Sequence, residues 1–364
     1  MSSLVSVNIL SYNSKRYIEG CLDTVLGQSH KNLEILVIIT GSDDGSAELI
    51  REKYGRQKRV KILEPGDNLW FSRGHNLGIR ASVGEYILVL NQDIVMEPDF
   101  IEKLVSAMEA DPALGSVSGK LLHYNYLINS KTKILDSTGI EISKTRRVID
   151  RGQWELDTHQ YDADLEIFGA SGAAAMFRRS ALEAVKLPKV RSNNITLPLR
   201  GESAPSVVTR GREVEEDFEY FDEDFVAYKE DIDLAWRLQL AGFRCRYVPE
   251  AILYHGRTVG RSWPNQLVRF IVNRRRQPRL FRMMAFKNHY LMMIKCELKS
   301  LFWRQFFFIF VRESLLLAYT IFFEPFQFKA IVELYRQIPE ALRKRALIMA
   351  NLRTDKERLR KLFH

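Results

Sequence analysis

The stretch Gly84-Glu85-Tyr86-Ile87-Leu88-Val89-Leu90-Asn91-Gln92-Asp93 decides the fold. Its five apolar residues, Tyr86 to Leu90, follow a Gly-Glu turn and predict a strand buried on both faces, as in the middle of a parallel sheet. Polar residues follow, and Pro98 precedes a helix expected from Asp99. Open α/β sheets bind ligands at the carboxyl ends of their strands, so a carboxylate at Asp93 is well sited for a divalent cation and the phosphates it neutralises. An ordinary strand followed by a polar loop explains these residues equally well.

The length and composition indicate a chain with a large core. With 364 residues, 46% of them hydrophobic, it can form one big α/β domain plus an appendage. A strand pattern begins at Val5, and no basic and apolar signal peptide is expected before it. Cys21, Cys245 and Cys296 have no metal-binding spacing, and their odd number suits a reducing cytoplasm.

Charge is distributed unevenly along the chain. Residues 1–270 hold 34 Lys/Arg against 38 Asp/Glu, a balance of −4, whereas residues 271–364 hold 20 against 7, a balance of +13. The first part is therefore mildly acidic and the tail strongly basic. This asymmetry predicts an anionic partner for the tail, either a lipid surface or nucleic acid.

The first half of the chain alternates strands with helices. Strands are expected at Val5–Leu10, Glu34–Ile39 and Val60–Leu63, and helices at Arg16–Leu26, Ala47–Tyr54 and, after a loop, within residues 68–80. Alternation at this pitch predicts right-handed crossovers and an α/β fold with a mostly parallel central sheet. Residues 189–219, rich in Pro, Arg, Ser and acids, break the pattern and are expected to form a mobile surface insertion.

Six motifs occur in an order and spacing that resemble the family 2 glycosyltransferases, which are inverting enzymes with the GT-A fold. They are Val7 to Asn13, Gly41 to Ser46, Asn68 to Gly78, Gly84 to Asp93, Gly169 to Ala174, and Phe221 through Arg237. The resemblance covers about residues 4–262 and implies a catalytic domain at 1–270. The chain is more similar to the bacterial rhamnosyltransferase-like branch, because of Asn-X-Asp at residues 91–93, Gly74-His75-Asn76, and a basic helical tail after His255.

The resemblance implies a nucleotide-sugar site at the ends of the first strands. Its residues are Leu10, Ser11, Tyr12, Asn13, Asp43, Arg73, Asn76, Asn91, Gln92 and Asp93. The first strand end and Tyr12 would form the shelf for the base, and Asn76 would reach the ribose or phosphates. Arg73 is a candidate counter-charge, although a solvated side chain explains it better. The family usually has Asp followed by Asp or Asn where this chain has Ile39-Thr40, so the common base-reading carboxylate is absent, and Asp43 is a candidate to compensate for it.

The implied metal site combines Asp93 with His255. Asp93 matches the family's metal-binding Asp, and Asn91 stands where many members have a second Asp. His255 follows a short apolar strand and resembles a further metal contact. Oxygen and nitrogen ligands together suit Mg²⁺ or Mn²⁺. By the same resemblance Ser171, Gly172 and Ala173 lie under the donor sugar and the acceptor.

Glu230-Asp231 begins a predicted helix. Acids in a first helical turn are favoured by the helix dipole, so simple capping is the alternative explanation, and it is strongest for Asp233. Paired acids can also raise the pKa of one member and hold an acceptor hydroxyl. By resemblance Asp231 is the general base, and Glu230 orients the acceptor or supports the base.

The tail at 271–364 is predicted to form basic, amphipathic helices that associate with a membrane. Leu301–Phe323 is its most apolar part, but Arg304, Arg312 and Glu313 interrupt it. A spanning helix needs roughly twenty apolar residues, so in-plane association is expected, with anionic lipid attracting the basic residues. The alternative is a helical subdomain packed on the catalytic core or on a second copy.

Together these features predict a metal-dependent inverting hexosyltransferase. It would move a sugar, L-rhamnose from dTDP-rhamnose being the expected case, from a dTDP- or UDP-sugar to a hydroxyl of a lipid-linked or growing surface polysaccharide such as O-antigen. Its expected place is the cytoplasm, peripherally on the inner face of the bacterial membrane, with a homodimer left open. A sugar-phosphate nucleotidyltransferase should carry a glycine-rich basic loop at Ser11 to Ser14, where this chain has none. Nucleic-acid binding is not expected, because the tail aromatics cluster on apolar stretches.

Overall fold

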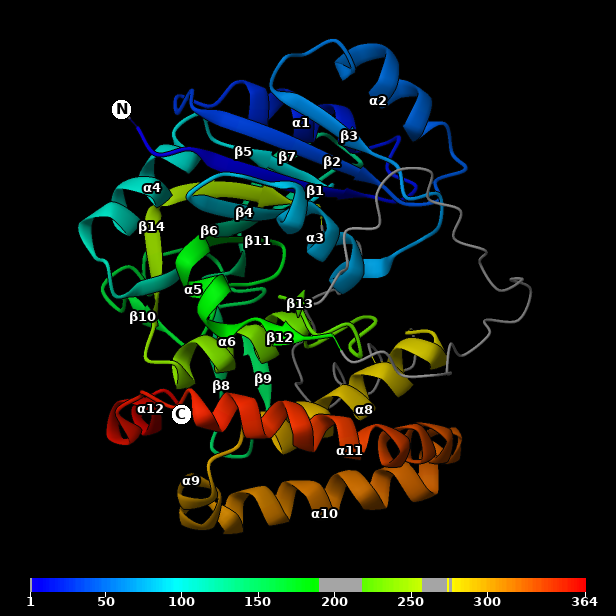
Figure 1. The fold of residues 1–364 in the computed structure, drawn as a ribbon, viewed down its shortest axis with the longest axis vertical. Helices are drawn as coiled ribbons and strands as arrows, with labels where there is room; N and C mark the ends of the chain where they lie inside the picture. The colour runs from blue at the N-terminus through cyan, green and yellow to red at the C-terminus, as the bar shows by residue number, and fades with distance from the viewer. Residues whose placement is uncertain (1, 190–217, 257–273, 275–276) are drawn as a thin grey trace.

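A computed structural model describes residues 2–189, 218–256, 274 and 277–364. A ten-stranded mixed sheet has the main strand order β10-β14-β6-β11-β4-β1-β2-β3, with β5 paired to β14 and β7 to β6. Helices pack against this sheet, and the C-terminal helices form a further layer at the end of the molecule opposite β2 and β3 (Figure 1). The α/β fold predicted from the alternation of strands and helices is confirmed.

The N-terminal half of the sheet is parallel, as predicted. Strands β1 (Val5–Ser11), β2 (Leu33–Ile39), β3 (Val60–Leu63) and β4 (Tyr86–Asn91) are connected by α1 (Ile18–Leu26), α2 (Ser46–Tyr54) and α3 (Trp70–Ala81). Tyr86 to Leu90 are fully buried, because β4 pairs with β1 on one edge and β11 on the other. The carboxyl ends of β1, β2 and β4 therefore meet at one edge of the sheet.

The second half adds antiparallel pairs and makes the sheet mixed. Its elements are β5 (Ile94–Met96), α4 (Phe100–Ala110), β6 (Leu114–Asn125), β7 (Ser130–Ser137), β8 (Ile140–Ile142), β9 (Val148–Asp150), β10 (Glu166–Ile167), β11 (Ala174–Arg178), α5 (Arg179–Val185), α6 (Glu230–Leu240) and β14 (Arg244–His255). Strand β14 pairs antiparallel with β5, and its register sets His255 opposite Ile94. This pairing brings the last residue of β14 beside the residue that follows Asp93.

A two-stranded sheet joins the two ends of the predicted insertion at 189–219. Strand β12 (Leu187–Pro188) pairs with β13 (Phe218–Glu219). Apart from those ends, the insertion lies outside the described residues.

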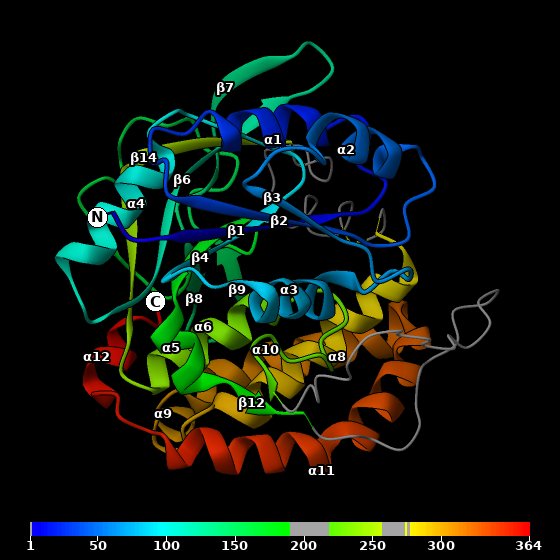
Figure 2. The same cartoon turned by 45° about the horizontal axis from the view of Figure 1, so that its top comes forward.

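The tail consists of helices that pack on the N-terminal part, residues 2–256, to different extents. They are α8 (Arg279–Cys296), α9 (Lys299–Arg304), α10 (Phe306–Phe323), α11 (Phe328–Ala350) and α12 (Lys356–Lys361), with a 3₁₀ turn at Pro325–Gln327. Helices α8 and α11 lie side by side next to α6 (Figures 1 and 2). Leu291 of α8 and Ile348 of α11 share a hydrophobic core with Trp236 of α6. Helix α10 lies on the outside, and most of its apolar side chains are exposed.

Buried ion pairs also join the tail to the N-terminal part. Lys344 Nζ of α11 lies 2.6 Å from Asp222 Oδ1 and 2.7 Å from Glu219 Oε1. Lys295 Nζ of α8 lies 2.6 Å from Asp233 Oδ1 and also contacts Asp222. Burial by itself lowers the pKa of the Lys344 amine, but these carboxylates outweigh it and raise that pKa well above its usual value. Part of the tail's positive charge is therefore neutralised inside the protein.

Replacing Lys344 by Met should strongly destabilise the protein. Removing one partner of a buried ion pair typically costs about 3–5 kcal/mol, since the remaining carboxylates stay buried without their cation. Arg343 is the matched control, because it is next to Lys344 in the sequence and its own side chain is 71% exposed. Arg343→Met should change the free energy of unfolding by less than about 0.5 kcal/mol. Urea denaturation of both variants measures the difference, and equal stabilities would show that the tail is not anchored by this cluster.

Candidate active site

Residues from two strands meet at the end of β4. Asp93 lies just beyond β4, and its Oδ1 is 3.3 Å from Nε2 of His255, the last residue of β14. The Asn91 amide Nδ2 is 3.4 Å from the same ring nitrogen. The structure therefore brings together three of the residues that the sequence singled out.

Asp136 completes this group from β7. It is fully buried, and its Oδ2 accepts a hydrogen bond from His255 Nδ1 at 2.7 Å. That bond fixes the ring so that Nε2 faces Asp93, which is how protein carboxylates commonly orient metal-binding histidines. No sequence motif contains Asp136, and only the pairing of β6 with β7 could have indicated it.

The charges at this group suit a cation. Burial raises the pKa of Asp93, but the ion pair and hydrogen bond with His255 outweigh burial and lower that pKa below its usual value. Burial lowers the pKa of His255, but Asp93 and Asp136 outweigh it and raise that pKa to about 10. A proton on His255 thus sits where a divalent cation would bind. Carboxylate oxygen and imidazole nitrogen fit Mg²⁺ or Mn²⁺ as ligands.

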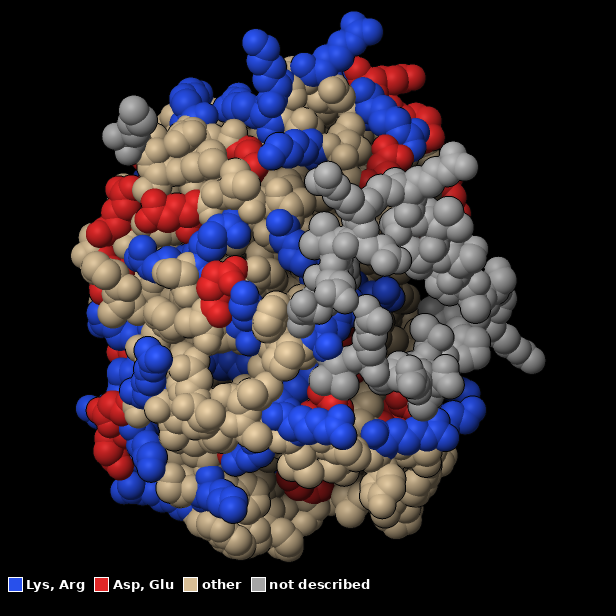
Figure 3. Space-filling view, in the orientation of Figure 1, with Lys and Arg blue, Asp and Glu red and all other residues tan. Residues whose placement is uncertain are grey.

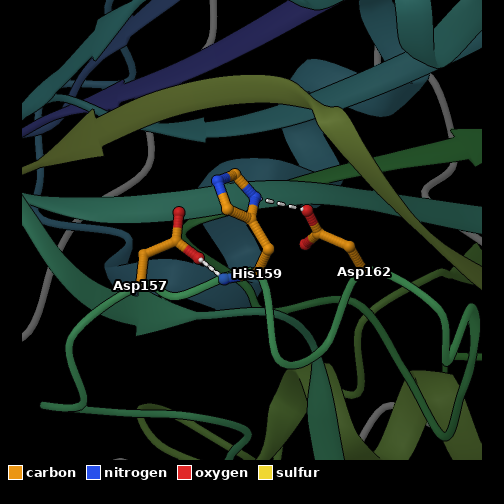
Figure 4. A group of neighbouring side chains, drawn as sticks. All are labelled: Asp157, His159 and Asp162. Atoms are coloured by element: carbon orange, nitrogen blue, oxygen red, sulfur yellow. Dashed lines mark hydrogen bonds and ion pairs between the residues drawn. The ribbon is translucent and has the colours of Figure 1, made fainter.

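A second group of possible metal ligands is already occupied by an ammonium. Asp157, His159 and Asp162 face one another from one loop (Figure 4). Lys120 Nζ, almost fully buried, lies 3.1 Å from Asp157 Oδ2 and 2.9 Å from Asp162 Oδ1. Because the ammonium already forms ion pairs with both carboxylates, this group is better described as a structural ion cluster. Asp93 and His255 are the better candidates for a metal site.

The loop after β1 is joined to the loops after β4 and β2 by hydrogen bonds between side chains and backbone. Tyr12 N donates to Gln92 Oε1 at 2.7 Å, and Gln92 Nε2 donates to Tyr12 O at 2.9 Å. Asp43 N donates to Asn13 Oδ1 at 3.0 Å. The Tyr12 ring is 45% exposed and remains available as a shelf, and the Asp43 side chain is exposed as well. Gln92 and Asn13 therefore shape this surface through the backbone.

The other two residues expected at the strand ends are tightly packed. Ser11 is buried, and its hydroxyl pairs with Ser14 Oγ at 2.7 Å. The Leu10 side chain packs against Gly74 of α3 so closely that a Cβ on Gly74 would lie 2.4 Å from Leu10 Cδ1. Glycine at 74 is therefore needed for α3 to approach β1.

Asn76 and Arg73 of α3 bind the protein itself. Asn76 is fully buried, and its Oδ1 accepts from the backbone N–H groups of Tyr220 and Phe221. Its Nδ2 donates to Phe221 O and to a carboxylate oxygen of Glu223. As placed, its amide has no free polar group for a ribose or phosphate. Arg73 Nε lies 3.8 Å from Glu223 Oε2, so both residues contact the segment that leads to α6.

The acid pair lies at the first turn of α6, as predicted. Glu230 is buried and Asp231 partly exposed. Gly172 N donates to Asp231 Oδ2 at 3.1 Å, and Asn91 N donates to Ala173 O at 2.9 Å. The segment of Ser171, Gly172 and Ala173 thus connects the acid pair to the Asp93 group. The approach is close, since a Cβ on Gly172 would lie 3.2 Å from Asp231 Oδ2.

Burial makes both acids of the pair harder to ionise. Burial and the neighbouring Asp231 charge raise the pKa of Glu230 to about 8, and burial is the main cause that raises the pKa of Asp231. Asp233 differs, because its Oδ2 accepts from Arg237 Nε at 2.9 Å and its Oδ1 pairs with Lys295. Asp233 therefore pairs with cations inside the core, whereas the pKa values of the buried Glu230 and the partly exposed Asp231 are raised.

Comparison with known proteins agrees with this arrangement. The fold is similar to that of solved structures of GT-A glycosyltransferases. GalNAc-T7 with UDP, GalNAc and Mn²⁺ has a TM-score of 0.54 at 11% identity, over 80% of this chain and 48% of that one. The Staphylococcus aureus protein TarS 1-349 with UDP has a TM-score of 0.51 at 14% identity, over 98% of this chain and 91% of that one.

Residues 6–186 match the profile of the family described as Glycosyl transferase family 2. This part of the chain belongs to the family. Glycosyltransferase GlyG of Streptococcus pneumoniae serotype 4 is 31% identical over 129 residues, 35% of this chain and 41% of that protein. The poly-beta-1,6-N-acetyl-D-glucosamine synthase of Staphylococcus epidermidis is 24% identical over 270 residues, 72% of this chain and 53% of that protein. The chain thus spans about half or less of the length of these relatives.

Metal binding should depend on Asp93 and be independent of the Lys120 cluster. Asp93→Asn should abolish Mn²⁺ binding, because it removes the only carboxylate facing Nε2 of His255 among the described contacts. Asp136→Asn should weaken Mn²⁺ affinity about 10- to 100-fold, the usual effect of losing a carboxylate behind a metal-binding His. Asp157→Asn is the control and should leave affinity unchanged. Titration of Mn²⁺ followed by electron paramagnetic resonance measures all three, and loss of binding in Asp157→Asn alone would place the metal at the other cluster.

Proposed function

We propose that the protein is an inverting, metal-dependent glycosyltransferase that moves a sugar from a nucleoside diphosphate to an acceptor hydroxyl. The observation that carries the proposal is the path from Asp93 through Asn91 and the 171–173 segment to Asp231. A donor bound at the strand ends would have its diphosphate at Asp93 and its sugar over Gly172. An acceptor hydroxyl would then lie beside the acid pair.

On the donor side, the residues bind the nucleotide sugar and orient it. Tyr12 offers its exposed ring to the base, and Gln92 holds the Tyr12 backbone in place. Asp93 and His255 would hold Mg²⁺ or Mn²⁺, and that ion neutralises the departing diphosphate when it is bound. Asp136 keeps the His255 ring in the required orientation.

On the acceptor side, Asp231 is the proposed base. It is partly exposed while Glu230 is buried, so Asp231 is the member of the pair that an acceptor can reach. The acceptor oxygen forms its bond to the anomeric carbon as the bond to the diphosphate breaks, and the hydroxyl proton passes to Asp231. Attack from the face opposite the leaving group inverts the anomeric configuration, and no covalent enzyme intermediate is needed.

The proposed donor is a dTDP- or UDP-sugar, with dTDP-rhamnose as the first to test. The motif similarity to the rhamnosyltransferase-like branch supports rhamnose, and the presence of a polysaccharide synthase among the relatives supports a growing glycan as acceptor. A panel of nucleotide sugars should be tested for thermal stabilisation with Mn²⁺, because a ligand that binds the native state raises its apparent stability by mass action. Stabilisation by another nucleotide sugar, and none by dTDP-rhamnose, would reassign the donor.

Asp231→Asn tests the base directly. Transfer should fall by about 10²–10⁴-fold, the usual contribution of general-base catalysis, while donor binding with Mn²⁺ persists. Glu230→Gln should reduce transfer less. Neither change should lower stability at pH 7. A carboxyl whose pKa is raised on folding makes the folded protein less stable as pH rises from the unfolded pKa to the folded pKa, and an amide does not ionise. Initial transfer rates and donor affinities of both variants measure this, and an active Asp231→Asn enzyme would exclude Asp231 as the base.

We propose that α10 docks in the plane of the inner face of the cytoplasmic membrane. It is long and apolar enough, by length and composition, to span a membrane, and only 11% of it is buried. The surface over α10, at the bottom of Figure 3, is largely free of charged side chains, and Lys and Arg gather above it. Glu313 points inward, since its Oε2 accepts from Tyr290 OH of α8 at 2.6 Å. A helix fastened to α8 at its middle suits the surface of a bilayer, where a lipid-linked acceptor would lie.

Replacing two exposed phenylalanines of α10 should weaken membrane binding. Phe307 and Phe322 are 72% and 77% exposed, and inserting each ring into the bilayer contributes roughly 1.5–3 kcal/mol. The double variant Phe307→Ser, Phe322→Ser should bind vesicles containing anionic lipid at least about tenfold more weakly. Leu127→Ser, an exposed apolar residue outside the tail, is the control and should bind normally. Flotation with vesicles measures the effect. Unchanged binding of the double variant would exclude α10 as the membrane-binding element. Equal binding of the wild type to neutral and anionic vesicles would show that electrostatic attraction does not contribute.

A further inference from the structure

The turn that leads into the acid pair is strained. Tyr228 has φ of 69° and Lys229 has φ of 72°, and these residues directly precede Glu230. Left-handed conformations of residues other than glycine cost about 1–3 kcal/mol each and persist only when surrounding contacts enforce them. Lys229 is also the N-cap residue of α6, a position normally taken by a short polar residue with extended backbone. Other parts of the protein must therefore hold this turn.

Asn288 of the tail helix α8 holds the turn. Its side chain is fully buried, and both N–H groups of its amide are used. Nδ2 donates to Ala227 O at 2.9 Å and to Tyr228 O at 2.8 Å. Successive carbonyl groups point at one amide because the left-handed turn directs them there. The neighbouring Lys287 donates to Asp224 O at 2.8 Å, so the contact extends along the segment.

Aromatic contacts add a second connection between α8 and the site. The Phe281 ring lies edge-on to the Tyr228 ring, with centroids 5.6 Å apart, and edge-on to the Trp70 ring at 6.2 Å. Trp70 begins α3 and also has a positive φ, 56°. Helix α8 therefore touches the strained residues at the start of α3 and before α6.

The opposite side of the same segment is held by α3. Ser72 Oγ donates to Phe225 O at 2.8 Å, and the Asn76 amide binds the backbone of Tyr220 and Phe221. The segment before α6 is thus fixed between α3, which belongs to the nucleotide-binding half, and α8, which belongs to the tail. The two side-chain hydrogen bonds that the structure shows on the carbonyls of the strained turn itself come from Asn288.

We propose that Asn288 is a positioning residue for sugar transfer. It fixes the backbone from Ala227 to Lys229 so that Asp231 faces the acceptor, and it acts from a helix outside the segment that matches the family profile. This inference rests on the proposed role of Asp231. An amide suits the position because it presents two N–H groups to two carbonyl oxygens, whereas an aspartate would set a carboxylate against them.

Asn288→Ala should separate transfer from donor binding. Transfer should fall about 10- to 100-fold, the scale of rate loss that a small misplacement of a catalytic group causes. The acceptor KM should rise, and the affinity for the nucleotide sugar with Mn²⁺ should stay within about twofold, since Asp93 and His255 are untouched. The acid limb of the pH–rate profile should also move, because a loosened turn admits water to the buried Glu230. Asn288→Ser, which restores one donor, should recover part of the rate.

Asn351→Ala is the matched control. Asn351 Nδ2 also links the tail to the catalytic part by donating to a backbone carbonyl, Ala184 O at 2.8 Å, away from the turn. Its variant should transfer sugar within about twofold of the wild type. If Asn288→Ala does not fold, Asn288→Ser carries the same comparison. Wild-type transfer by the Asn288 variants, or a parallel loss of transfer, donor affinity and stability, would overturn the positioning role.

Wild-type protein and Asp231→Asn are measured in the same assay. Absence of transfer by the wild type with every nucleotide sugar, or full activity of Asp231→Asn, would overturn the proposed function. An active wild type, an inactive Asp231→Asn and an unimpaired Asn288→Ala would overturn this inference alone.

Discussion

The buried pairing of Lys295 and Lys344 with acids of the catalytic part is the interaction on which the rest of the structure depends. Each lysine lies in a different tail helix, and both contact Asp222. Charges taken out of water are tolerated only when their partners are in place, because the desolvation penalty is several kcal/mol per ion. Asp222 and Asp233 can therefore remain buried as ions only with α8 and α11 docked. The acid turn and the tail are consequently one structural unit, although the family profile ends at residue 186.

Acids along this segment divide into two kinds according to their partners. The Lys295 and Lys344 ammonium groups outweigh the effect of burial on Asp222 and hold its pKa far below the usual value. The pKa of Glu230 is raised to about 8, by burial first and then by Asp231. Asp222 is thus stabilised in its ionised form, whereas the ionised form of Glu230, eight residues later, is disfavoured. Carboxyls whose pKa values are shifted in opposite directions are typical of active sites, where such shifts are retained at a cost in stability.

The features that could be predicted from the sequence are those that depend on local residue patterns. The buried run at β4, the strand-end position of Asp93 and the first-turn position of Glu230 and Asp231 follow from periodicity and from the edge at which parallel strands end. Asp136 could not be predicted in the same way, because it meets His255 only through the pairing of both β7 and β14 with β6. Asn76 was assigned to a nucleotide, but a single sequence does not distinguish an amide that faces a ligand from one that binds backbone 144 residues away. Net charge is incomplete in a similar way, because composition counts the lysines of the tail without showing that Lys287, Lys295 and Lys344 are buried.

Arg312 and Glu313 show how the same helix can be apolar outside and polar inside. In the sequence they interrupt an apolar stretch, and in the structure Glu313 and Arg312 contact Tyr290 and His289 of α8. The outer face of α10 is left with exposed phenylalanines. His289 is the residue next to Asn288, so the contacts of α10 and those of the acid turn fall on adjacent positions of α8. With α10 on a bilayer as proposed, α8 sets a fixed distance between the lipid surface and Asp231. That geometry suits an acceptor whose sugar stands at a constant height above the lipid that carries it.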